Sequence, residues 1–167
     1  MRNSKDVLAS GLVAFAIACS QISNGSDERN VSMDKSPVSV KLEVKPTPDD
    51  LVATLMFQNV SDRTIHLDKY SVCLTEDQTM RLFEIVDQHG KALKYTGLMI
   101  KRKFNGNDFV GLEPGSSLKA TVTLSKWYDF HDGSHEYSVT YKAFNHSYEK
   151  ETLFNMTSNT VVVTYKK

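Results

Sequence analysis

The sequence predicts an all-β domain, and three observations lead to this fold class. Apolar and polar residues alternate in several short segments, which is the pattern of half-buried strands. Residues that favour turns separate these segments, and no run of ten or more residues has a convincing helical period. Because a lone sheet cannot bury its apolar face, two sheets must pack together. We therefore expect an immunoglobulin-like β-sandwich of seven to eight short antiparallel strands.

The first half of this domain, which begins at Pro37, contains four expected strands. Residues 38–44 carry valine or leucine at every second position. Prolines end this strand, and a second, denser strand is expected over 51–57. Turn residues follow before extended structure resumes at 64–67, and residues 80–86 form the fourth strand.

The second half of the domain adds three strands after an ambiguous segment. Residues 97–100 have the pattern of either a strand or an irregular edge. Proline and glycine at 114–115 suit the second and third positions of a tight turn. Beyond that turn, apolar residues alternate over 117–124, 137–143 and 160–165, so each of these segments should bury one face.

The first 18 residues have the pattern of an export signal. Basic residues open it, and the apolar stretch over 7–18 is too short to cross a bilayer. Ala16-Ile17-Ala18-Cys19 resembles a bacterial lipobox, with Ala16 where leucine is usual. We expect cleavage before Cys19 and acylation of this cysteine, for example with palmitate. The protein would then be anchored in the bacterial cell envelope, at the outer membrane and facing the periplasm or the surface. Cleavage near Ala18 without acylation, giving a secreted protein, is the alternative.

A polar stretch over residues 19–36 lacks any sustained period. It therefore predicts a flexible tether between the anchor and the domain, which covers residues 37–167. A flexible chain of this length spans roughly 20–25 Å on average. The sequence has 20 basic and 20 acidic residues and no basic stripe, so nucleic acid is not an expected partner.

No segment of the sequence supplies a catalytic apparatus. His135-Glu136 begins like the HExxH motif of zinc peptidases, but Val139 stands where the second histidine is needed, and the alternation predicts a strand. His131 and His135 lie in or beside a turn, where we expect solvated side chains; a weak metal site is the alternative. Cys73 lies in an apolar stretch and should be a buried thiol rather than a nucleophile. We expect no catalytic residues, no metal ligands and no cofactor.

Two short clusters could contact a partner protein. A compact basic run is either a solvated loop or edge strand, or a docking patch for an acidic surface. The densest aromatic cluster either packs against the edge of the core or, if exposed, acts as a binding anchor. The candidate partner-binding residues are Lys101, Arg102, Lys103, Trp127, Tyr128 and Phe130.

Several short elements occur in the order and rough spacing of a known module. The most specific is Leu-Ser-x-x-Tyr-Asp-Phe followed by Tyr-x-Val-x-Tyr. The elements are residues 59–62, 95–97 with Lys101, 112–117, 124–130 and 137–141. Over roughly residues 38–165, the chain resembles the N-terminal pro-domain of deuterolysin-like (aspzincin) zinc endopeptidases, including the lysine-specific ones.

The resemblance implies an immunoglobulin-like cap that assists folding of the protease and keeps it inactive until removed. The sequence up to Lys167 has no HExxH motif and no aspartate ligand after one, so we expect this pro-domain-like module to stand alone. It would then inhibit a cognate protease or act as its folding chaperone, with Lys101 or Lys103 in an acidic specificity pocket. A general envelope adhesion or scaffold module, or a metal-binding lipoprotein that uses His131 and His135, are the alternatives.

Overall fold

The computed structural model describes residues 36–75, 80–146, 148 and 153–167. The expected signal segment, Cys19 and nearly all of the tether lie outside these residues. Among the described residues, no helix has the length and apolar character needed to cross a membrane.

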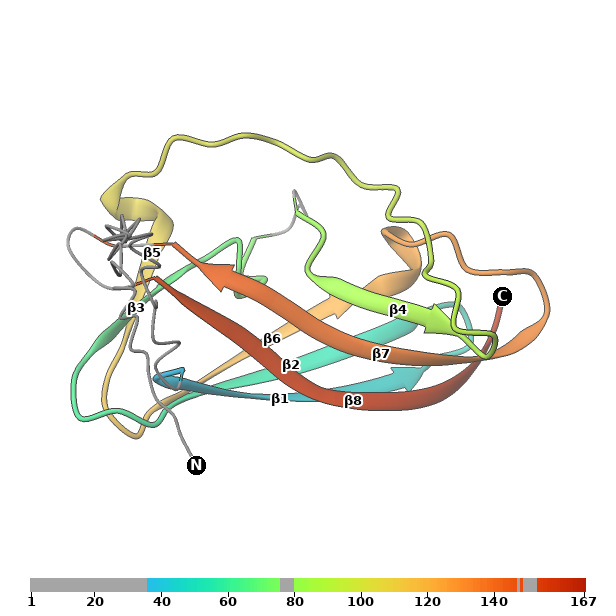
Figure 1. Cartoon of the computed structure of the whole chain (residues 1–167), viewed down its shortest axis with the longest axis horizontal. Coiled ribbons are helices and arrows are strands. Elements are labelled where there is room, and N and C mark those ends of the chain that lie inside the picture. Colours follow the sequence, from blue (N-terminus) through green and yellow to red (C-terminus); the bar gives the residue numbers. More distant parts are fainter. Residues whose placement is uncertain (1–35, 76–79, 147, 149–152) are drawn as a thin grey trace, which may run out of the picture. The chain divides into compact units, whose positions relative to one another are not determined.

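The described chain is an all-β sandwich, as predicted (Figure 1). One sheet has six strands in the order β4-β7-β8-β1-β2-β6, and β3 and β5 form a second sheet. Apolar residues of both sheets belong to one hydrophobic core. The strands are β1 (Val38–Pro46), β2 (Leu51–Asn59), β3 (Ile65–Asp68), β4 (Phe83–Asp87), β5 (Phe109–Leu112), β6 (Ser117–Thr123), β7 (Ser134–Asn145) and β8 (Phe154–Lys166), with single 3-10 turns η1 (Gly106–Asp108) and η2 (Leu124–Lys126).

Residues 97–100 form no strand, in agreement with the irregular edge that was one of the two predicted possibilities. The structure departs from the predicted strands in two places. The strand β5 was not predicted. β7 and β8 have 12 and 13 residues, so they are not short. The added N-terminal half of β8 is rich in polar residues and pairs with β7 through backbone hydrogen bonds, with a register shift between Thr140 and Lys142. Backbone pairing of this kind leaves no periodic apolar signal in the sequence.

One pair of neighbouring strands is parallel, unlike the antiparallel arrangement that was predicted. β1 and β8 are joined by a single backbone bridge, between Val40 and Ser158. Beside it, the Asn159 side chain accepts a hydrogen bond from the Leu42 N–H at 2.9 Å and donates one to the Leu42 carbonyl at 3.1 Å. The Asn159 amide thus makes the two hydrogen bonds to Leu42 that a backbone group of β8 would make if the β1–β8 pairing continued.

Aromatic residues fill the centre of the core. Tyr141 is fully buried on β7, and its ring meets Phe57 and Phe83 edge to face, at centroid distances of 5.5 and 5.6 Å. Cys73 is buried, as predicted. Its φ of 58° lies in the left-handed region, where a non-glycine residue is uncommon.

The connection between β4 and η1 crosses one side of the domain from end to end (Figure 1). We call residues 88–105 the crossing segment. Its first part is tied to the core by a bond from the Leu93 N–H to the Ile85 carbonyl, and its middle by one from the Thr96 N–H to the Trp127 carbonyl. At Gly97 the segment is packed so closely that a Cβ there would clash with the end of the Tyr95 ring and lie 3.0 Å from Cε3 of Trp127. Only glycine fits this position without a shift of its neighbours.

Candidate binding surface

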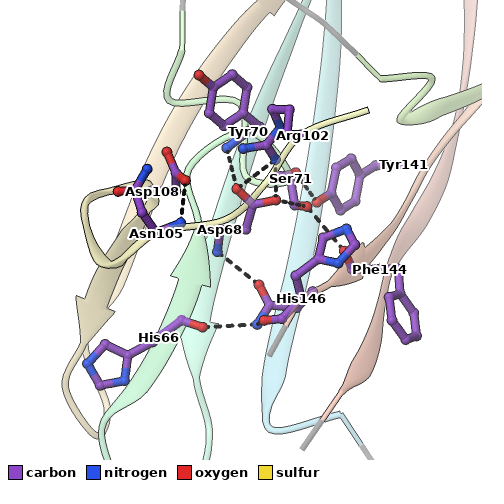
Figure 2. Close-up of polar contacts among 11 residues, drawn as sticks. His66, Asp68, Tyr70, Ser71, Arg102, Asn105, Asp108, Tyr141, Phe144 and His146 are labelled. Atoms are coloured by element: carbon purple, nitrogen blue, oxygen red, sulfur yellow. Dashed lines mark hydrogen bonds and ion pairs between the residues drawn. The ribbon is translucent and has the colours of Figure 1, made fainter. Parts of the chain in front are cut away.

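The middle residue of the basic run lies inside the protein. Nη2 of Arg102 is 2.9 Å from Oδ2 and 3.1 Å from Oδ1 of Asp68, the last residue of β3 (Figure 2). The Asp68 side chain is fully buried, and only 12% of the Arg102 side chain is exposed. Both predicted possibilities for the basic run, a solvated loop or edge strand and an exposed docking patch, are therefore wrong for Arg102. It is an internal anchor that attaches the crossing segment to β3.

Further contacts around this ion pair explain how it is tolerated inside the domain. The Tyr70 N–H and the Ser71 hydroxyl donate to the Asp68 carboxylate at 3.1 and 2.9 Å. The guanidinium lies 3.6 Å from the centroid of the Tyr70 ring and 4.8 Å from that of Phe104. Nη1 of Arg102 is buried and has no hydrogen-bond partner among the described residues. Most of the buried charge is therefore paired and hydrogen-bonded, as burial requires.

A buried asparagine connects this ion pair to the end of β7. Oδ1 of Asn145 accepts a hydrogen bond from the Asp68 N–H at 3.0 Å, and its Nδ2 donates to the His66 carbonyl at 2.9 Å. The Tyr141 hydroxyl donates to the Ser71 carbonyl at 2.6 Å. Side chains of β7 thereby hold β3 and the residues after it in one polar network, which fixes the partner of Arg102 in place.

The C-terminal end of the crossing segment is fixed by the η1 turn. The Asn105 side chain accepts from the Asn107 N–H, and the Asp108 carboxylate accepts from the Asn105 N–H, both at 2.9 Å, which is a capping box. Nζ of Lys69 also donates to the Asn107 carbonyl at 2.7 Å. The segment is therefore held on both sides of residue 103.

The two remaining residues of the basic run point outward. Lys101 and Lys103 are exposed, whereas Arg102 and Phe104 on either side of Lys103 are partly or largely buried. The structure thus presents two lysine side chains on a segment whose intervening residue is anchored in the core. This part of the predicted basic patch stays accessible to a partner.

The aromatic cluster packs in the core, which was one of the two predicted possibilities. Tyr128 and Phe130 are buried, so they form no exposed anchor. The Tyr128 hydroxyl donates to the Phe83 carbonyl at 2.8 Å and accepts from the Phe83 N–H at 3.0 Å, and burial raises its pKa. Phe130 meets Tyr137 edge to face, at a centroid distance of 5.0 Å. Trp127 is half-buried.

Beside the exposed Lys101 lies an apolar groove that the sequence analysis did not predict. It has a volume of about 430 Å³ and is formed by the residues before β4, the crossing segment and the end of β7. The run of three consecutive apolar residues over 98–100 is the one sequence signal that could have suggested it. In the structure these residues are 72%, 77% and 50% exposed, and the last two line the groove. The apolar lining residues are Met80, Leu82, Met99, Ile100, Ala143 and Phe144.

His131 and His135 lie at the N-terminal end of β7, near the buried carboxylate of Asp87. Nε2 of His131 is 3.5 Å from Oδ2 of Asp87. Both ring nitrogens of His135 contact protein atoms, Nε2 the Asp132 carbonyl at 2.8 Å and Nδ1 the Gln88 amide at 3.3 Å. Over the described ranges, no three His, Cys, Asp or Glu side chains are placed to hold a metal ion.

Replacing Asp87 with asparagine is expected to remove part of the acid sensitivity of the domain. The Lys91 and His89 N–H groups donate to this carboxylate at 2.9 Å, and the Lys91 bond is the main cause of its lowered pKa. The stabilisation is complete above the unfolded-state pKa of 3.8 and is lost as the pH falls through the lower folded value. We expect the melting temperature of the native protein to fall more than that of Asp87→Asn between about pH 5 and about pH 2. Equal falls would contradict this role.

No family model matches the chain, and no curated protein matches it. The chain offers a partner two features, an anchored segment with two exposed lysines and an apolar groove beside this segment.

Proposed function

We propose that this chain is a non-catalytic binding domain that acts on a zinc endopeptidase of the aspzincin type, as an inhibitor or as a folding chaperone. Acylation of Cys19 would hold it in the bacterial envelope. The partner class rests on the resemblance to protease pro-domains over roughly residues 38–165. The observation that carries the binding role is the anchored crossing segment, which presents Lys101 and Lys103.

Anchoring matters because binding is opposed by the ordering of flexible loops. A segment that is already fixed loses less conformational entropy when it contacts a partner. Here the Arg102–Asp68 ion pair and the η1 turn fix the backbone on both sides of Lys103. A lysine held in this way could enter an acidic specificity pocket, as the side chain of a lysine-containing substrate does in a lysine-specific protease.

The test is inhibition of a purified lysine-specific zinc endopeptidase by the full chain. We expect the native protein to slow cleavage of a peptide substrate, and the double variant Lys101→Ala, Lys103→Ala to inhibit about 10- to 100-fold more weakly, which is the range for binding hot spots. A matched control is Lys41→Ala, Lys45→Ala, because these lysines of β1 are 71% and 80% exposed and lie outside the crossing segment. The control should inhibit like the native protein.

A refolding assay distinguishes an inhibitor from a chaperone. The denatured protease is diluted into buffer with and without the full chain, and recovered activity is measured after the chain has been removed. A higher yield supports the chaperone role. If the chain neither inhibits the protease nor raises this yield, the proposed function is wrong. Equal inhibition by the native protein and the Lys101, Lys103 variant would exclude these two side chains as the contact.

A further inference from the structure

The groove exposes apolar side chains that no described part of the chain covers completely. Met99 is 77%, Ile100 50% and Phe144 41% exposed, and all three line the groove. Removing apolar surface from water is worth roughly 25 cal/mol per Å², so a partner that covers these side chains gains binding energy. A volume of about 430 Å³ lies in the range of ligand and side-chain pockets.

The charges at the rim indicate what kind of partner fits. Arg81, Lys101 and Lys142 line the groove, and none of its described lining residues carries a carboxylate. Lys142 is bonded to Glu84, which lowers the pKa of that carboxyl and offsets one positive charge. Arg81 and Lys101 therefore supply the remaining positive potential, which favours an acidic partner.

We propose that the groove binds an acidic segment of a partner protein. An apolar side chain of that segment contacts Met99, Ile100 and Phe144, while neighbouring carboxylates face Arg81 and Lys101. The concave shape favours a side chain of a protein segment over the flat surface of a membrane. The inference rests on the proposed binding role, but it does not require that the partner is a protease.

The experiment is isothermal titration calorimetry of the full chain with three synthetic peptides of equal length. The first has leucine and phenylalanine at its centre and aspartate and glutamate on both sides. The second replaces the acidic residues with lysine, and the third replaces the apolar pair with serine. We expect the first peptide to bind at least about tenfold more tightly than either control, because each control removes one of the two complementary features.

Two variants of the chain locate the site. Met99→Ser, Ile100→Ser is expected to weaken binding of the first peptide about tenfold or more, since it removes apolar contact without touching the buried core. The matched control is Val162→Ser on β8, whose side chain is 59% exposed and does not line the groove. It should bind like the native protein. Arg81→Glu, Lys101→Glu should shift the preference toward the lysine peptide.

Several results would overturn the inference. Equal binding of the acidic and lysine peptides would exclude charge recognition, and equal binding by the Met99, Ile100 variant and the Val162 control would place the site elsewhere. Flotation of the chain with anionic vesicles that is lost in the Met99, Ile100 variant, without peptide binding, would assign this face to a membrane.

The protease assays use a different readout, so the two proposals can fail separately. Protease inhibition without peptide binding would overturn only the proposal that the groove binds an acidic segment. Peptide binding without an effect on the protease would overturn only the proposed function.

Discussion

Replacing Arg102 with alanine is expected to destabilise the domain by about 3–5 kcal/mol, because Asp68 is then buried without its charged partner. The variant also loses the contacts of the guanidinium with Tyr70 and Phe104. The free energy of unfolding of natural domains is only about 5–15 kcal/mol, so the variant would lose much of its stability. Urea unfolding of the native protein and the variant measures the change.

A double variant separates the charge from the packing. In Asp68→Asn, Arg102→Met no uncompensated charge is left in the interior, and the methionine still contacts the neighbouring rings. We expect this protein to recover most of the stability that Arg102→Ala loses. If both proteins are equally unstable, packing rather than the ion pair holds the segment. A loss below about 1 kcal/mol for Arg102→Ala would show that Asp68 is solvated in solution.

Replacing Tyr141 with alanine is expected to destabilise the domain by a similar amount, about 3–5 kcal/mol. The side chain is fully buried, its ring contacts Phe57 and Phe83, and its hydroxyl donates to the Ser71 carbonyl. Truncation therefore leaves a cavity in the core and an unsatisfied carbonyl beside the polar network. Thermal or urea unfolding gives the change in the free energy of unfolding.

Tyr141→Phe is the matched control, since it keeps the ring and removes only the hydroxyl. It should cost about 1–3 kcal/mol, the penalty for leaving a buried acceptor without its donor. If phenylalanine and alanine have the same effect, the ring contributes nothing and the core has collapsed around the site. Ser71 is shared with Asp68, so Tyr141→Phe and Arg102→Ala should not be additive.

The alternation of apolar and polar residues predicted the strands that bury one face. Residues 38–44 are the clearest case, since the side chains of β1 are buried and exposed in turn. The N-terminal half of β8 is polar and is a strand because β7 offers it backbone partners. β5 has only four residues and pairs with β3, which precedes it by more than 40 positions. Pairings of this kind depend on the tertiary structure and leave little trace in a single sequence.

The binding surface was harder to predict, because three adjacent cations have different environments. Apart from its residue type, nothing local distinguishes Arg102 from Lys101 and Lys103; the difference in environment comes from Asp68, which is 34 positions away in the chain. Arginine is better suited than lysine to a buried ion pair with a carboxylate, so the residue type was the available hint. The groove is built from three segments that are distant in sequence, and only the apolar run over 98–100 could have indicated it. Acylation of Cys19 stays a prediction.

The close approach at Gly97 gives this protein a built-in optical reporter. The chain contains a single tryptophan, so its intrinsic indole emission comes from one position. That indole lies against Gly97 in the crossing segment, and the Trp127 carbonyl accepts a hydrogen bond from the Thr96 N–H. A partner that lifts or tightens the segment would change the hydration of the half-buried ring. The emission maximum of the unlabelled protein therefore follows the segment that carries Lys101 and Lys103.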